Sequence, residues 1–117
     1  TPQERVEMIE NEVKEINLPN NNKVTVECFE GLVVDLARKY DAISLIKGVR
    51  GPVDYDYEAQ MAGMNTVMCP ELETIFLMSK PEFSFIHSSL VKQISLMGGD
   101  VTGFVSDSIK NQLKTKS

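Results

Sequence analysis

The chain has 117 residues, of which 42% are hydrophobic and 25% are charged, and its formal net charge at pH 7 is −5. The apolar fraction is too high for a disordered chain, and the sequence has no run of about 18 apolar residues that could cross a membrane. The negative net charge argues against non-specific binding to nucleic acid or to anionic lipid. A chain of this length supports one hydrophobic core, so we expect a single domain over residues 1–117.

Cysteine and histidine are scarce in this sequence. Cys28 and Cys69 lie far apart without C-x-x-C spacing, and His87 is the only histidine. This pattern argues against a zinc site or a disulfide framework. No secretory signal peptide is visible at the start, so we expect two free thiols and a cytoplasmic location, where thiols stay reduced.

The first part of the chain alternates helical and extended patterns. Thr1-Pro2-Gln3-Glu4 predicts a capped helix start, and apolar residues at helical spacing continue to about Ile16. After a polar loop, residues 24–29 alternate apolar and polar side chains, which predicts a strand. Gly31 ends that strand, and the apolar spacing over residues 32–40 predicts a second helix.

The same alternation continues to the C-terminus. Residues 43–46 form an apolar run typical of a parallel strand buried on both faces. A helix over residues 55–68 and a strand over residues 74–78 follow. A helix over residues 88–97, stopped by Gly98-Gly99, and a short helix capped by Ser106 complete the order. The 55–68 helix places Tyr57, Met61, Met64 and Met68 on one face, and we expect its three methionines to pack in the core, the alternative being an adaptable ligand pocket.

Strands that alternate with helices imply a parallel α/β sheet with right-handed crossovers. Doubly wound sheets usually begin with a strand whose following loop carries the first ligand-binding motif. This chain opens with a helix and offers three strands. Either the fold is unusually small, or an N-terminal portion lies outside the chain.

The loop after the 43–46 strand combines two cations with two glycines. Lys47-Gly48-Val49-Arg50-Gly51 lies at the carboxyl end of a strand, where ligands gather in open α/β sheets. Glycine allows close backbone approach, and lysine with arginine can neutralise phosphate. The alternative is a tight strand-to-helix turn with two solvated charges.

A second candidate ligand site is the start of the 88–97 helix. Ser88 and Ser89 would offer backbone N–H groups and hydroxyls to an anion at the positive end of the helix dipole. The alternative is an ordinary serine N-cap. The acidic run from Asp54 to Glu58 opens the preceding helix, where negative charge is favourable without any ligand.

Several segments together resemble the bacterial phosphopantetheine adenylyltransferase family of the nucleotidyltransferase superfamily. The resemblance follows the chain in order from Thr1 to the C-terminus, and the motifs are specific to this family in combination. They are Ile46-Lys47-Gly48-Val49-Arg50, Asp54-Tyr55-Asp56-Tyr57-Glu58, Met64-Asn65, the run from Pro70 to Leu77, the run from Glu82 to Lys92, and Gly99-Asp100-Val101.

The resemblance implies a Rossmann-like parallel sheet and a reversible adenylyl transfer in coenzyme A biosynthesis. ATP and 4′-phosphopantetheine would give dephospho-coenzyme A and pyrophosphate, with Mg²⁺ accompanying the ATP. Members of the family assemble into homohexamers. From the charge and the lack of a long apolar run, we expect no nucleic-acid or membrane partner.

The resemblance also implies a role for individual residues. The ATP-binding set comprises Gly48, Val49, Arg50, Glu58, Phe83, Ser84, Phe85, Ile86, His87, Ser88 and Ser89. Lys47 would hold the phosphate of 4′-phosphopantetheine, and Leu32, Val33, Met61, Met64 and Asn65 would line the pantetheine arm.

The resemblance is incomplete at the N-terminus. The family carries a T/H-x-G-H motif whose histidine stabilises the transition state, and this sequence contains no such motif. The catalytic residue is therefore not assigned. We expect that the chain lacks the N-terminal strands of the domain and that it is weakly active or inactive alone. His87 stands where the family usually has serine, and Phe83 where it usually has tyrosine or tryptophan.

Three interpretations follow from the sequence. The first is an adenylyltransferase represented by the larger C-terminal part of its domain. The second is a non-catalytic descendant that binds coenzyme A or nucleotide, or serves in assembly. The third is a structural α/β domain in which the two cationic loops are coincidental.

Overall fold

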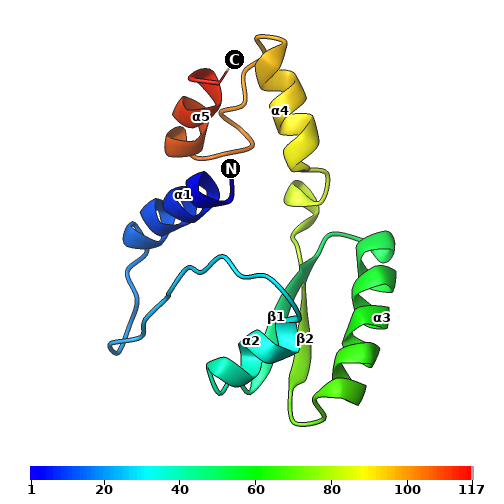
Figure 1. Cartoon of the computed structure of the whole chain (residues 1–117). Coiled ribbons are helices and arrows are strands. Elements are labelled where there is room, and N and C mark those ends of the chain that lie inside the picture. Colours follow the sequence, from blue (N-terminus) through cyan, green and yellow to red (C-terminus); the bar gives the residue numbers. More distant parts are fainter. Residues whose placement is uncertain (117) are drawn as a thin grey trace. The chain divides into compact units, whose positions relative to one another are not determined.

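The computed structural model describes residues 1–116. The chain forms two compact units, one made of residues 30–86 and the other of residues 1–29 together with the described residues from 87 onward. The elements in chain order are α1 (Pro2–Lys14), α2 (Val33–Lys39), β1 (Ser44–Val49), α3 (Pro52–Met68), β2 (Glu73–Met78), the 3₁₀ helix η1 (Pro81–Phe83), α4 (Ser88–Leu96) and α5 (Asp107–Lys114) (Figure 1).

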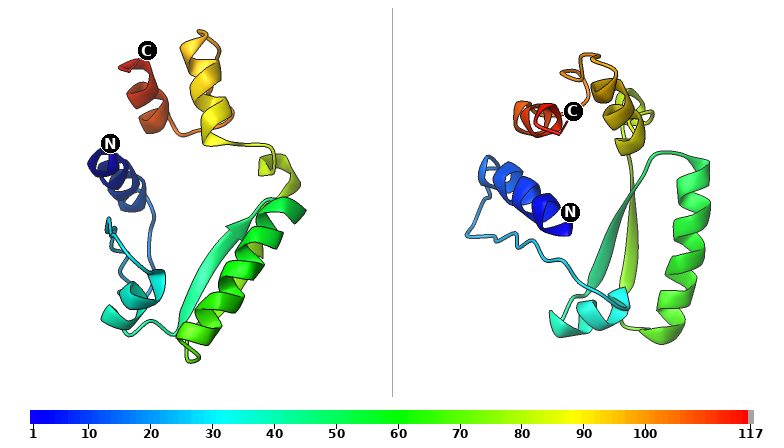
Figure 2. Two further views of the ribbon diagram at one scale, coloured as in Figure 1. Left: turned by 45° about the vertical axis from the view of Figure 1, so that its right-hand side comes forward. Right: turned by 45° about the horizontal axis from the view of Figure 1, so that its top comes forward.

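A parallel strand pair organises the first unit. β1 and β2 pair from Ser44 opposite Glu73 to Val49 opposite Met78. Parallel strands need a crossover connection, and α3 supplies it, running beside the two strands in both views of Figure 2. This arrangement confirms the α/β class and the two predicted strands around residues 43–46 and 74–78.

The core of this unit lies where α2 meets the segment between α3 and β2. Val34 and Ala37 of α2 are buried with Cys69 and Leu72, and Leu45 of β1 packs against them. Across the same contact, Arg38 Nη2 donates a hydrogen bond of 2.7 Å to the carbonyl oxygen of Met68. The C-terminal ends of α2 and α3 are thereby joined.

Two strand predictions are wrong. Residues 24–29 form no strand, since the sheet of the described residues contains β1 and β2 alone. Alternating side chains describe an extended backbone, but a strand also needs a hydrogen-bonded neighbour. Nor is β1 buried on both faces, because Ile46 is 65% exposed. Its more buried residues are Leu45, Lys47 and Val49, the period of two that one covered face produces.

The methionine-rich face of α3 is also not the core face. Tyr57 is 65% exposed and Met64 is 63% exposed. The buried residue of α3 is Asn65, and the half-exposed Tyr55 ring lies edge-on to Phe76 of β2 at 5.4 Å. The contacts of α3 with the sheet therefore do not follow its methionine stripe alone.

The second unit contains α1, α4 and α5, and its predicted caps are confirmed. Thr1 and Glu4 form a reciprocal capping box at the start of α1. The Ser106 hydroxyl accepts from the backbone N–H of Ile109 and donates to Glu12 Oε1 at 2.6 Å, which ties α5 to α1.

No helix within residues 1–116 is long and apolar enough to cross a membrane.

Candidate functional site

The cationic segment predicted as a phosphate loop is partly strand. Lys47, Gly48 and Val49 complete β1, and Val49 is only 1% exposed. Arg50 follows at the carboxyl end of the strand, and Gly51 is the N-cap of α3. The turn from strand to helix is therefore short, and it presents the N-terminus of α3 directly beside Arg50.

Arg50 is held by a carboxylate and by a backbone carbonyl. Its Nε donates to Asp54 Oδ2 at 2.8 Å, its Nη2 donates to Asp54 Oδ1 at 3.1 Å, and its Nη1 donates to the Ile86 carbonyl at 3.1 Å. The hydrogen bond with Asp54 raises the pKa of Arg50, while partial burial opposes that shift. The guanidinium is thus a fixed positive group at the carboxyl end of the strand.

Lys47 also has an acidic neighbour on α3. Its ammonium lies 3.5 Å from Glu58 Oε2, and the two side chains are 40% and 26% exposed. Glu58 stands one helical turn beyond Asp54, so one face of α3 supplies a carboxylate to each cation of the loop. The structure therefore brings together Lys47, Arg50 and Glu58 of the predicted site.

The residues predicted to line the pantetheine arm occupy two places. Leu32 and Val33 begin α2, where Leu32 is the N-cap and is exposed. Met61 and Asn65 follow Glu58 at helical spacing on α3, and Asn65 is only 5% exposed. Met64 points away from this face, as its exposure shows. These assignments stay predictions.

The remaining predicted residues follow β2. Phe83 ends η1 and is half exposed, and Ser84 Oγ donates to the Pro81 carbonyl at 2.8 Å. Phe85 is exposed as well, and Ile86 contributes its carbonyl to Arg50. The residues from Phe83 to Ile86 therefore belong to the unit that contains the sheet.

At the start of α4, the alternative of an ordinary serine N-cap is wrong. His87 is the N-cap, and Ser88 and Ser89 are the first two helical residues. The His87 side chain makes no capping hydrogen bond to a backbone N–H of this helix start. Uncapped N–H groups at a helix start are suited to an anion. The assignment of these residues to ATP remains a prediction.

Asp54 is the site residue that sequence reasoning missed. An acidic residue is favourable in the first turn of any helix, so Asp54 needed no partner such as Arg50 to account for its presence there. The signal was the spacing of four residues between the arginine after the strand and the carboxylate in the first helical turn. That spacing allows the Arg50 backbone N–H to reach Asp54 Oδ2, at 3.1 Å, like a capping contact.

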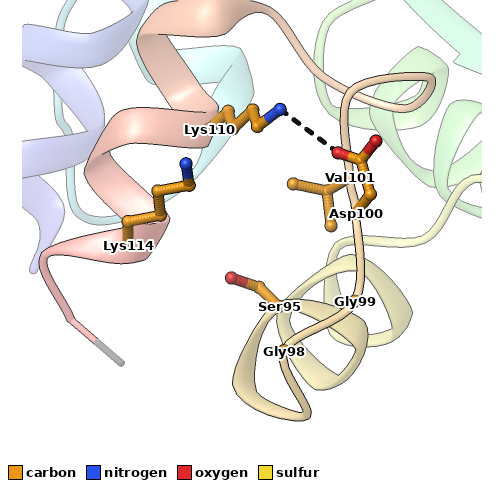
Figure 3. A pocket seen from close by; sticks show the side chains of 7 residues that line it. All are labelled: Ser95, Gly98, Gly99, Asp100, Val101, Lys110 and Lys114. Atoms are coloured by element: carbon orange, nitrogen blue, oxygen red, sulfur yellow. Dashed lines mark hydrogen bonds and ion pairs between the residues drawn. The ribbon is translucent and has the colours of Figure 1, made fainter.

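A separate hollow lies in the unit that contains α4 and α5. It encloses about 390 Å³ and is lined by Ser95, Gly98, Gly99, Asp100, Val101, Lys110 and Lys114 (Figure 3). Lys110 donates to Asp100 Oδ1 at 3.2 Å and also to the Thr102 hydroxyl. None of the predicted ligand-binding residues lines this hollow.

A parallel α/β unit with cations and glycines around the carboxyl end of a strand is consistent with a nucleotidyltransferase-type Rossmann-like fold. No model of a known protein family matches the chain. Similarity to individual proteins is nevertheless strong. The chain belongs to the phosphopantetheine adenylyltransferase family.

Three relatives carry this assignment, all named phosphopantetheine adenylyltransferase. The protein of Brucella ovis is 45% identical over 113 residues, which is 97% of this chain and 69% of the relative. The Alkaliphilus metalliredigens protein is 44% identical over 114 residues, 97% of this chain and 69% of the relative. The Parvibaculum lavamentivorans protein is 44% identical over 110 residues, 94% of this chain and 65% of the relative.

These relatives confirm the predicted family and the enzyme class. They support a role in coenzyme A biosynthesis, and they do not favour the non-catalytic alternative. The structural interpretation, in which the loop residues are coincidental, loses its basis because the similarity covers nearly the whole chain.

Proposed function

We propose that this protein transfers AMP from ATP to 4′-phosphopantetheine, giving dephospho-coenzyme A and pyrophosphate. The observation that carries the proposal is 45% identity over 97% of the chain with an enzyme named for this activity. The cationic carboxyl end of β1 supports it, because both substrates are phosphorylated.

In this proposal the two cations of the loop serve different substrates. Lys47 binds the phosphate of 4′-phosphopantetheine, and Arg50 binds the phosphates of ATP with Gly48, Val49 and Glu58 beside it. The transfer needs no covalent intermediate. Holding the phosphate nucleophile close to the α-phosphate of ATP lowers the entropy barrier, and fixed cations offset the negative charge of the transferring group.

Mg²⁺ fits this proposal as a companion of ATP. The described residues contain no group of three or more histidine, cysteine, aspartate or glutamate side chains that could hold a metal ion. The nearest carboxylates to the loop, those of Asp54 and Glu58, face Arg50 and Lys47. Mg²⁺ is commonly held largely by substrate phosphates and water, so we assign no protein cage to it.

We further propose that the protein acts in the cytoplasm as a homo-oligomer, the hexamer of its family. The single chain supports this with exposed apolar side chains on α3, where Val53 is 85% exposed and Val67 is 82% exposed. Together with Tyr57 and Met64, 65% and 63% exposed, they form an exposed apolar row on one side of α3, and contiguous exposed apolar surface often marks contacts between proteins. Sedimentation velocity of the purified protein measures the oligomeric state directly.

The experiment that tests the activity measures dephospho-coenzyme A by mass spectrometry after incubation with ATP, Mg²⁺ and 4′-phosphopantetheine. It is run on the 117-residue chain and on the protein translated from the complete reading frame, each with an Arg50→Ala control. We expect product from the complete protein and less from its Arg50→Ala variant. Binding of both substrates without any product in either form would favour a non-catalytic binding module.

A further inference from the structure

Asp54 accepts three hydrogen bonds from one residue. The Arg50 guanidinium reaches both carboxylate oxygens, and the Arg50 backbone N–H reaches Oδ2 at 3.1 Å. The carboxylate therefore holds the arginine at its backbone and at the far end of its side chain. The two residues are 35% and 31% exposed, so the pair lies at the margin of the site rather than in open solvent.

The geometry of this pair fixes direction as well as distance. A planar guanidinium that meets a carboxylate through two parallel N–H groups has little freedom to rotate. The contact from Nη1 to the Ile86 carbonyl adds a third point. Arg50 thereby links the end of β1, the first turn of α3 and the segment that follows η1, all within one unit.

We propose that Asp54 is a positioning residue for ATP, which acts by holding the Arg50 guanidinium in the orientation that receives the nucleotide phosphates. The proposal rests on the proposed function, since it assumes that Arg50 binds ATP. Arginine side chains lose considerable rotamer freedom when they bind. A side chain ordered beforehand loses less of it on binding the ligand, which raises affinity.

If Asp54 does not position Arg50, the same contacts predict the opposite change in ATP affinity when Asp54 is replaced. A carboxylate on the guanidinium competes with an incoming phosphate for the same donors. Removing the charge of Asp54 would then strengthen ATP binding, whereas loss of positioning weakens it. The direction of the change in ATP affinity therefore decides between the two.

The experiment is calorimetric titration of ATP into the full chain and its variants. Asp54→Asn removes the charge and one acceptor, and we expect ATP affinity to fall by about tenfold, as for loss of a charge-assisted contact. Asp56→Asn is the matched control, because Asp56 carries the same charge on α3 and contacts Gln60 at 3.5 Å. We expect no change in its ATP affinity.

A double variant tests whether Asp54 acts through Arg50. Once Arg50 is alanine, Asp54→Asn has nothing left to position, so we expect no additional loss of ATP affinity. Affinity for 4′-phosphopantetheine, assigned to Lys47, stays unchanged in Asp54→Asn. A loss of both affinities would indicate a general distortion of the loop and would overturn the proposal.

The remaining outcomes separate this proposal from the proposed function. If the unmodified chain binds ATP and Asp54→Asn binds it equally well or better, Asp54 is not a positioning residue and the function stands. If the unmodified chain and the protein of the complete reading frame both fail to bind ATP, the proposed function fails first.

Discussion

The Lys47 ammonium lies 3.5 Å from Glu58 Oε2, so the C-terminal half of β1 is joined to the second turn of α3 by an ion pair. Both residues belong to the predicted site, one for each substrate. A carboxylate beside an ammonium holds it in place and reduces its net attraction for a second anion. The pair therefore couples the two halves of the proposed site.

The first prediction separates Lys47 from Arg50 by a crossed pair of variants. Lys47→Ala should weaken binding of 4′-phosphopantetheine, and Arg50→Ala should weaken binding of ATP, since each removes one charged hydrogen-bond donor. Such a contact contributes about 1.5–3 kcal/mol, which is on the order of ten- to hundredfold in Kd. Calorimetric titration of each substrate into each variant measures all four values.

Circular dichroism of both variants controls for folding. Equal losses for both substrates in either variant would contradict the separate assignments, as would an unchanged affinity of Arg50→Ala for ATP. Lys23→Ala is a matched control, because Lys23 is an exposed cation in the loop after α1 and outside the predicted site.

The second prediction concerns thiol reactivity. Cys69 is only 2% exposed, whereas Cys28 is exposed, and both are free thiols. Burial raises the pKa of the Cys69 thiol, and its hydrogen bond with Glu71 raises that pKa further. The thiolate is the reactive form of cysteine. At neutral pH we therefore expect iodoacetamide to modify Cys28 at least about ten times faster than Cys69, because Cys69 reacts only when the protein unfolds locally.

Peptide mass spectrometry over a time course measures both rates. The same labelling in denaturant provides the control, because unfolding exposes both cysteines and should bring the rates together. Comparable rates in the folded protein would show that the core around Val34 and Cys69 is not packed as described.

The third prediction is a stability change in acid that depends on Asp100. Hydrogen bonds from the Thr102 side chain and backbone, with a further one from Lys110, lower the pKa of Asp100 from 3.8 to about 2. A carboxylate whose pKa is depressed in the folded state stabilises that state above its unfolded pKa. The stabilisation by Asp100 is present above pH 3.8 and is lost as the pH falls toward about 2.

Asp100→Asn cannot titrate at this position. We therefore expect the difference in melting temperature between the unmodified chain and Asp100→Asn to shrink as the pH is lowered through that window. Thermal denaturation followed by circular dichroism at several pH values measures it. A difference that stays constant would exclude the described hydrogen bonds as its source.

The fourth prediction contrasts two glycines. Gly98 follows the C-cap of α4 with φ of +79°, a conformation that a side chain disfavours, so Gly98→Ala should cost about 1–2 kcal/mol. Gly63 lies inside α3 with open space where a Cβ would stand, so Gly63→Ala should stabilise the helix by about 1 kcal/mol. Urea denaturation measures the change in the free energy of unfolding for both variants. Equal changes would contradict the positive φ of Gly98 at the end of α4.

Much of the secondary structure was predictable because its signals are local. The capping box at Thr1, the Ser106 cap and the glycine pair after α4 each set an element boundary through contacts within about one helical turn. The predicted strand over residues 24–29 failed because strand formation depends on a partner distant in sequence. The core face of α3 was misjudged for the same reason.

The sequence predicted residues for the candidate site but not how they pair. Lys47, Arg50 and Glu58 were predicted from motifs, and their roles stay predictions. The role of Asp54 as the partner of Arg50 was not predicted, because negative charge at a helix start already has a sufficient local explanation. Only the folded chain shows that the carboxylate turns toward the guanidinium.

The sequence by itself determined the alternation of helices and strands, the family and the residue types gathered after β1, since these follow from local periodicity and from similarity along the chain. The tertiary structure decided which face of α3 packs on the sheet, which carboxylate holds which cation, and which cysteine is buried. Those outcomes depend on contacts between residues separated in sequence, and the free energy of such contacts exists only once the chain is folded.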